Sequence, residues 1–164
     1  MRDSIAGLWL YGLILIFMVF MIGFIAVFFN YNKTYRTKTE VVNVIEEYQG
    51  LNSTSIKKIK GILSSEGYTA SKTCTSDSSL VCIYDSGKSV AKVTAADGKQ
   101  AASICNVCIT REKYETTVQK VKYTEYYYTA QLYMTLTLPV FGSLLTVNLA
   151  GTTNGIYYPY DSYF

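Results

Sequence analysis

Histidine is absent from the sequence, and proline and tryptophan are rare, with two and one copies among 164 residues. Without histidine the chain lacks the usual general base near neutral pH, the commonest metal ligand, and every Ser/His or Cys/His catalytic arrangement. A glycine-rich phosphate-binding loop is also missing. Glu112 and Glu115 would point to opposite faces of a strand, which favours a solvated surface over an acid/base pair. We therefore expect a non-catalytic protein without a cofactor or a bound metal.

Charge is also sparse. The formal net charge is +3, and the basic residues are spread along the chain without forming a run. This distribution gives no basic patch for a nucleic acid, so we expect no nucleic-acid partner. Tyrosine is abundant instead, with 16 copies, and together with threonine it clusters in the C-terminal half. That composition suits sheet surfaces that pack on one side and are solvated on the other.

The N-terminal segment is long and apolar. No charged residue occurs from Ile5 to Phe29, and a helix needs about 20 apolar residues to cross a hydrocarbon core roughly 30 Å thick. A cleavable signal peptide normally has an apolar region of only about 7 to 15 residues, followed by small residues at the cleavage site. We predict that residues 1–29 form a retained anchor in the lipid bilayer, with an unusual signal sequence or a buried core helix as alternatives. Gly7, Gly12 and Gly23 would let neighbouring helices approach closely, although exposure of these glycines to lipid is an equal alternative.

The flanking charges and the cysteines disagree about orientation. Lys33, Arg36 and Lys38 follow the span, and the positive-inside rule would then place the C-terminal domain in the cytoplasm. Four cysteines and a Ser/Thr/Tyr-rich composition are instead typical of an exported domain, and long C-terminal domains translocate despite flanking charge. We favour a single-pass protein of the cell membrane whose C-terminal domain is extracellular.

Residues 30–50 are predicted to continue the anchor as an amphipathic helix. Val41, Val42, Ile45 and Tyr48 form one apolar stripe, and neither proline nor glycine occurs between Tyr31 and Gln49. The helix would end at Gly50 as its capping residue, giving a rod of about 45 residues and roughly 67 Å. The alternative is a kink near Asn30 and Asn32, because asparagine is a weak helix former.

Residues 51–164 are predicted to form one α+β head domain. Ser53, Thr54 or Ser55 would cap a short helix that buries four aliphatic residues, exposes three lysines and closes at Gly67; these are Ile56, Ile59, Ile62 and Leu63, and Lys57, Lys58 and Lys60. A strand follows from Leu80 to Tyr84. The stretch from Asp85 to Ser103 is expected to be mostly loop, with edge strands at its weak apolar positions, Val90 and Val93.

The strongest strand pattern lies between Tyr114 and Leu149. Aliphatic residues alternate with polar ones at Leu132, Met134, Leu136 and Leu138, which predicts a half-buried strand. Pro139 and Gly142 mark a connection to a second alternating run that contains Leu145, Val147 and Leu149, and a further edge strand is expected at Ile156 to Tyr158. Laying the amphipathic helix across this sheet would bury both apolar surfaces, so we predict a helix packed on an antiparallel sheet.

The four cysteines are Cys74, Cys82, Cys105 and Cys108, and the last two form a C-x-x-C motif. The leading interpretation is one or two structural disulfides, with three pairings left open. Zinc binding by the four thiolates is an alternative, although only one C-x-x-C is present where a strong site has two. A thiol redox motif at Cys105 and Cys108 is a further alternative, but it would need a helix N-terminus to lower the thiolate pKa, and a β-rich stretch follows.

Both ends of the chain resemble TadE-like minor pilins, or pseudopilins, of tight-adherence (Tad) systems in the type IV filament superfamily, of the Gram-positive type. The resemblance is carried by the uncharged N-terminal helix, the N-Y-N-K-T-Y-R-T-K segment from Asn30 to Lys38 and the L-P-V-F-G-S-L-L-T-V-N-L-A-G-T-T block from Leu138 to Thr153. It implies a pilin-like head and a helix that packs against other pilins or against assembly-platform proteins. One departure is that no Glu follows Gly7 before Glu40, so processing by a prepilin peptidase is not expected.

The leading functional hypothesis is a membrane-anchored minor pilin or pseudopilin that helps to assemble or decorate an extracellular filament. Two alternatives belong to other classes. The first is a membrane-tethered thiol oxidoreductase that uses Cys105 and Cys108. The second is a cell-envelope binding module that recognises a carbohydrate or protein through tyrosines such as Tyr126, Tyr127 and Tyr128. Because consecutive strand residues point to opposite faces, ordinary sheet packing explains that tyrosine run better.

Overall fold

The structure is a computed structural model of the whole chain. It describes residues 2–76, 79–84, 90–94, 101–118, 121–138 and 142–164. The predicted connection at Pro139, and the parts of the predicted 85–103 loop at residues 85–89 and 95–100, lie outside the described residues.

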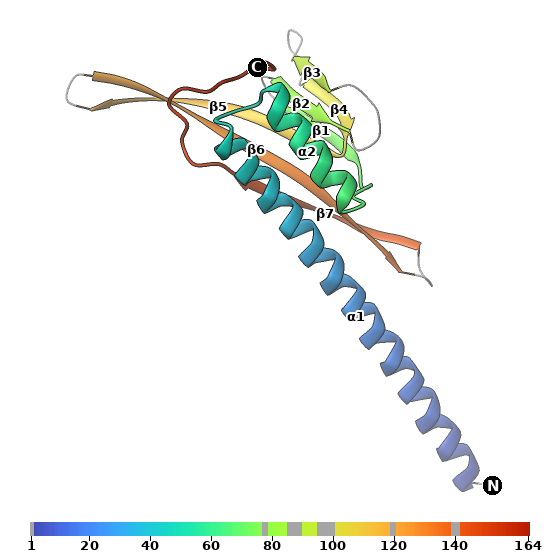
Figure 1. Cartoon of the computed structure of the whole chain (residues 1–164). Helices are drawn as coiled ribbons and strands as arrows, with labels where there is room; N and C mark the ends of the chain where they lie inside the picture. The colour runs from blue at the N-terminus through green and yellow to red at the C-terminus, as the bar shows by residue number, and fades with distance from the viewer. Residues whose placement is uncertain (1, 77–78, 85–89, 95–100, 119–120, 139–141) are drawn as a thin grey trace.

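A single unbroken helix, α1 (Arg2–Glu47), runs for 46 residues from the N-terminus into the head, which confirms the predicted rod (Figure 1). The expected alternative, a kink at Asn30 and Asn32, is not observed. The hydroxyl of Thr34 donates to the carbonyl of Asn30 at 3.0 Å, so the polar residues in this stretch are accommodated by hydrogen bonds along the helix itself.

The end of α1 differs in detail from the prediction. Gln49, rather than Gly50, adopts the left-handed conformation that follows the helix, with φ 50°. The amide of Gly50 donates to the carbonyl of Ile45 at 2.9 Å, and that of Gln49 donates to Glu46 at 3.1 Å, which together form a Schellman motif. Gly50 is required for a different reason: a side chain there would be strained and would meet the C-terminal tail. Its φ is 129°, and a Cβ there would lie 2.5 Å from a carboxylate oxygen of Asp161.

In the second helix, α2 (Ser53–Ser65), Ile56, Ile59 and Leu63 are buried as predicted and Ile62 is partly buried, but the predicted N-cap residues were wrong. Asn52 is the N-cap: its side-chain oxygen accepts hydrogen bonds from the amides of Thr54 and Ser55, and Ser55 completes a capping box. Asn52 is the last residue with an extended backbone, as an N-cap requires, whereas Ser53, Thr54 and Ser55 already lie within the helix. Gly67, with φ 56°, ends the helix as predicted. Lys57 and Lys58 are exposed, whereas Lys60 is only half exposed.

In the described ranges, seven strands form two antiparallel sheets. Their bounds are β1 (Lys72–Ser76), β2 (Ser79–Ile83), β3 (Ala91–Thr94), β4 (Ala101–Cys105), β5 (Val107–Val118), β6 (Val121–Leu138) and β7 (Gly142–Thr152). The main sheet has the order β3-β2-β5-β6-β7, and β1 pairs with β4 in a separate two-stranded sheet. The predicted strand at Leu80, the edge strand at Val93 and the β6–β7 hairpin are therefore confirmed. The expected final strand is reduced to one bridge between Ile156 and Tyr126.

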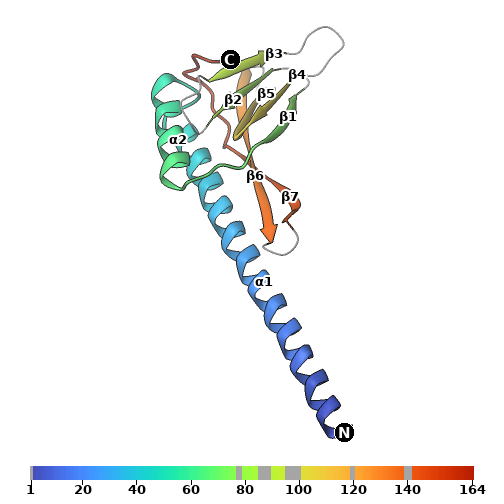
Figure 2. The same cartoon turned by 90° about the vertical axis from the view of Figure 1, so that its right-hand side faces the viewer.

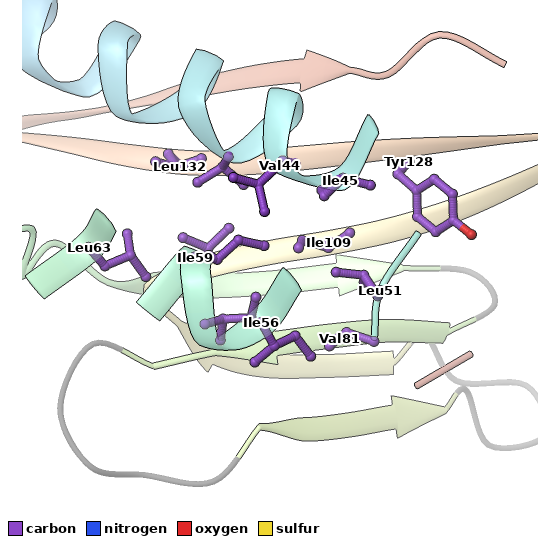
Figure 3. Packing of buried hydrophobic residues seen from close by; sticks show 14 of the residues in the cluster. Val44, Ile45, Leu51, Ile56, Ile59, Leu63, Val81, Ile109, Tyr128 and Leu132 are labelled. Atoms are coloured by element: carbon purple, nitrogen blue, oxygen red, sulfur yellow. The ribbon is translucent and has the colours of Figure 1, made fainter. Parts of the chain in front are cut away.

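The head has three layers. Both helices lie on one face of the main sheet, and the small sheet lies on the other face (Figures 1 and 2). Side chains from α1, α2 and the main sheet converge between the helices and the strands (Figure 3). We call this group the helix-side core: Val41, Val44, Ile45, Leu51, Ile56, Ile59, Leu63, Tyr68, Val81, Ile83, Val107, Ile109, Tyr128, Ala130, Leu132 and Ile156. The α+β arrangement of a long apolar helix packed on an antiparallel sheet is thus as predicted.

The alternation along β6 is only partly as predicted. Leu132 and Met134 are buried as expected, but Tyr133, which belongs to the opposite face, is also buried, with 3% of its surface exposed. The small sheet covers that face at this point, so both sides of the strand are buried here. Where α1 crosses β7, Gly151 allows the close approach, because a Cβ there would lie 3.0 Å from Cδ of Lys38.

Candidate functional sites

From Trp9 to Phe29, α1 has no packing partner among the residues that the structure describes. Its large side chains from Trp9 to Phe29 are exposed, in contrast to Val41 and Ile45, which are fully buried. Between Trp9 and Glu47 the helix is long and apolar enough to cross a membrane, and none of its most apolar stretch is buried. Exposing so much apolar side-chain surface to water is unfavourable. This feature fits a single-pass anchor or a signal sequence.

The predicted helix-packing glycines all lie in α1, but they do not share one face. Gly12 and Gly23 are eleven residues apart, which in an α-helix places them within about 20° of each other, whereas Gly7 is turned away from Gly12 by roughly 140°. The same eleven-residue step leads from Gly23 to Thr34 and then to Ile45. Thr34 and Ile45 are buried against the head. The Gly12 and Gly23 face therefore continues the stripe of α1 that packs on the sheet.

No described part of the chain occupies the space beside Gly12: a Cβ there would meet no atom within 4 Å. This space is available to a neighbouring helix or to lipid. Small residues at such positions allow helix backbones to approach closely.

All four cysteines gather where the small sheet meets the main sheet. Cys82 and Cys105 form a disulfide with a Cα to Cα distance of 5.3 Å, while Cys74 and Cys108 are free and buried. With Leu80 and Tyr133 they make up what we call the sulfur core. The prediction of a structural disulfide is thus met, and the structure selects one of the pairings that the sequence left open.

The geometry of the C-x-x-C motif disfavours thiol exchange chemistry. Cys105 is bonded to Cys82 and not to Cys108, and the motif joins two strands instead of preceding a helix. The hydrogen bond with Cys74 and burial raise the pKa of the Cys108 thiol, the opposite of what a reactive thiolate requires. The sulfur atoms of Cys74, Cys105 and Cys108 lie within 4.8 Å of one another. Because Cys105 is already bonded, only two thiols remain, and structural zinc takes four ligands.

A buried carboxylate that sequence reasoning missed fixes the C-terminal tail. Asp161 accepts hydrogen bonds from the amide of Leu51 at 2.8 Å and from the hydroxyl of Tyr128 at 2.5 Å, and it pairs with Arg111 at 2.6 Å. Only 6% of its side chain is exposed. We call these four residues the C-terminal clamp. The clamp ties the tail to the turn between the helices and to the main sheet. The one sequence signal for it is a lone acidic residue within a tyrosine-rich end.

A groove of about 770 Å³ lies where β5 and β6 meet the C-terminal tail and the end of α1, whose Glu46 and the following Gln49 also line it. Its lining includes Tyr123, Glu125, Tyr157 and Tyr158, and a shallower hollow beside it adds Tyr114, Tyr127 and Glu112. The hydroxyl of Tyr127 donates to Glu125 at 2.6 Å, and that of Tyr114 donates to Glu112 at 2.9 Å. No lysine or arginine lines either hollow within the described residues. We call this surface the tyrosine groove.

The three consecutive tyrosines Tyr126, Tyr127 and Tyr128 are divided between the two faces of the main sheet. Tyr127 faces the groove. Tyr126 and Tyr128 belong to the helix side, where Tyr128 is fully buried and Tyr126 packs against the core. The expectation that strand geometry would divide these tyrosines between two faces is confirmed. Comparison with known protein families, with curated proteins and with solved structures finds no match to this chain.

Proposed function

We propose that this chain is a non-catalytic, membrane-anchored pilin-like subunit, related in role to TadE-like minor pilins, that helps to assemble, initiate or decorate an extracellular filament. The observation that carries the proposal is α1: its exposed apolar half continues without a break into a stripe that forms the core of the head. A helix of this kind can lie in a bilayer and can also pack among identical or related helices.

Two further observations support this role. The sulfur core contains a disulfide, and disulfides persist in oxidising compartments outside the cytosol. The face of α1 that carries Gly12 and Gly23 is free of intramolecular contacts at Gly12, so another helix could approach there. The resemblance of the sequence to TadE-like minor pilins is the basis for proposing a filament of the Tad type.

The first experiment deletes the gene and counts surface filaments by electron microscopy, together with protease treatment of intact cells. We expect fewer filaments and impaired adhesion with normal growth, and we expect the protease to remove the head. Unchanged filaments would contradict the proposed role, and a shielded head would contradict the proposed orientation. Neighbouring genes for a secretion ATPase and a polytopic platform protein would support the assignment.

A second experiment tests helix packing without disturbing the fold. Gly12→Leu places a side chain in open space on α1, so we expect a stable, membrane-associated protein that enters sheared filaments poorly. Gly61→Leu is the matched control, because Gly61 lies in α2 and also has no atom within 4 Å of an added Cβ. Equal incorporation of the two variants would show that the glycine face is not used.

The tyrosine groove favours a second candidate function, recognition of a neutral carbohydrate of the cell envelope. Exposed tyrosine rings can stack on sugar rings, and the neighbouring carboxylates of Glu112 and Glu125 can accept hydrogen bonds from sugar hydroxyl groups. Binding of cell-wall polysaccharide to the full chain would test it. We expect Tyr158→Ala to lose binding and Tyr160→Ala, an equally exposed position outside the groove lining, to retain it.

A further inference from the structure

The two free cysteines of the sulfur core lie in different sheets. Cys74 lies in β1 of the small sheet and Cys108 lies in β5 of the main sheet. The existing disulfide also joins the sheets, since Cys105 ends β4 of the small sheet and Cys82 lies in β2 of the main sheet. Cys82 and Cys108 are opposite each other in the pairing of β2 with β5. The second pair of sulfurs therefore lies beside the first.

The geometry points to a second disulfide, between Cys74 and Cys108, so that the small sheet is attached to the main sheet by two parallel crosslinks. The Sγ atoms of these residues lie within 4.8 Å of each other. Cys74 is 1% exposed and Cys108 is completely buried.

The sulfur core also explains why a second crosslink would be needed. Among the described residues its buried members besides the four cysteines are Leu80 and Tyr133, with four partly buried residues packed against them: Ala70, Tyr84, Ala91 and Val93. Such a small cluster buries little apolar surface, and small cores are commonly supplemented by disulfides. Among the described residues, β1 and β4 reach the main sheet chiefly through this cluster, so the crosslinks would hold the small sheet in place.

Formation of the bond is a balanced two-electron oxidation. One thiolate of the pair attacks an external disulfide, such as that of an oxidised glutathione or a protein disulfide oxidant, and releases one thiol. The second thiolate then attacks the mixed disulfide, which gives the Cys74–Cys108 bond and a second released thiol. Two protons leave the cysteines, and the external disulfide is the species reduced. Because both sulfurs are buried in the finished head, this exchange belongs to folding, before the small sheet closes over the site.

The first test measures free thiols in the full chain. The protein is extracted in detergent, denatured in the presence of N-ethylmaleimide without reductant, and weighed by intact mass spectrometry. We expect no added label and a mass lower than the reduced chain by four hydrogen atoms. Two labels would overturn the inference, because only one disulfide would be present. Four labels would show that the chain from cells is reduced, and the refolding experiment described below then decides the pairing.

The second test identifies the partners. Trypsin leaves Cys74 and Cys82 on one peptide and Cys105 and Cys108 on another, because no lysine or arginine lies between the members of either pair. Cleavage before Asp77 separates the first two, and fragmentation between Asn106 and Val107 separates the others. A fragment linking Cys74 to Cys108 supports the inference. A fragment linking Cys74 to Cys105 overturns it.

Variants keep the inference separate from the location of the head, on which the proposed function also depends. Cys82→Ser with Cys105→Ser leaves the predicted pair alone, and we expect it to carry no label, whereas Cys74→Ser should carry one. If the chain from cells is reduced, refolding with oxidised glutathione still decides the pairing: a Cys74–Cys108 bond upholds it while contradicting export. Failure to form the bond under these conditions as well overturns the pairing itself.

Discussion

The main sheet carries a different kind of core on each face. The helix-side core holds sixteen buried residues that come from both helices, the strands and the tail. The sulfur core on the other face holds six, and four of them are cysteines. Burial of apolar surface is sufficient to hold both helices on one face, whereas the short strands β1 and β4 bury too little and depend on covalent bonds. The layers on the two faces of the main sheet are thus held in different ways. The helices are held by burial of apolar surface, and the small sheet, which covers less apolar surface, is held by a disulfide.

The largest expected effect is on the helix-side core. Ile109→Ala in β5 removes a fully buried side chain that faces α1 and α2, and we expect a loss of about 3 to 4 kcal/mol in the free energy of unfolding. Denaturant titration of the full chain in detergent, followed by circular dichroism, measures it. Ile104→Ala is the control, because Ile104 in β4 is 62% exposed and should change stability little. Equal losses for the two variants would mean that the helix-side core is not the dominant one.

The next effect concerns the sulfur core. Replacing Cys82 and Cys105 by serine opens a crosslink that spans 23 residues of sequence, and a loop of that size is expected to contribute about 3 kcal/mol. Hydrogen exchange should show the loss concentrated in β1 and β4, with α1 still protected. A uniform loss over both helices would contradict the separation of the two cores.

A smaller loss is expected at the C-terminal clamp, which belongs to the helix side. Asp161→Asn keeps the shape but removes the charge that pairs with Arg111, and we expect about 2 kcal/mol, because Arg111 is partly exposed and keeps some hydration. Thermal unfolding measures the change. Glu115→Gln is the control, since its pair with Lys113 is exposed. A stability equal to that of the unchanged chain would show that the tail is held mainly by packing.

The smallest expected effect is a loss of stability that appears only at alkaline pH. Tyr68 lies in the helix-side core, and its hydroxyl bonds both backbone groups of Tyr133, which is part of the sulfur core. Burial raises the pKa of Tyr68 from 10.0 to about 12. The stability that depends on its neutral form is therefore complete below pH 10 and is lost as the pH rises through about 12.

Melting temperatures between pH 8 and pH 12 test this link between the two cores. The unchanged chain should lose stability above pH 10. Tyr68→Phe should be less stable at pH 8, because it leaves backbone groups of Tyr133 without their hydroxyl partner, but it should fall less steeply in alkali. Burial also raises the pKa of Tyr128 and Tyr133, so some decline will persist in the variant. Parallel profiles for the two proteins would exclude Tyr68 as the cause.

The features that sequence could predict are those with a local cause. The length of α1, the end of α2 at Gly67 and the alternation at Leu132 and Met134 follow from periodicity and from glycine conformation. Features that depend on distant segments could not be predicted. Burial of Tyr133 requires the small sheet above it, and the role of Asp161 requires a tail that returns to Leu51 from 110 positions away.

The candidate sites follow the same division. The apolar half of α1 was evident from composition, and the cysteines were identified as a structural set. Their pairing needed the packing of the small sheet on the main sheet, which no local pattern contains. The tyrosine groove likewise depends on the placement of the tail beside β6.

Because α1 is one unbroken helix, its exposed apolar half and the half that packs on the sheet form one continuous rod. A movement of the head would therefore be passed along this helix to its apolar half. The angular position of the head is also set by residue count. One residue inserted near Asn30 would turn the Gly12 and Gly23 face by about 100° relative to the sheet, and four would bring it back to within roughly 40°.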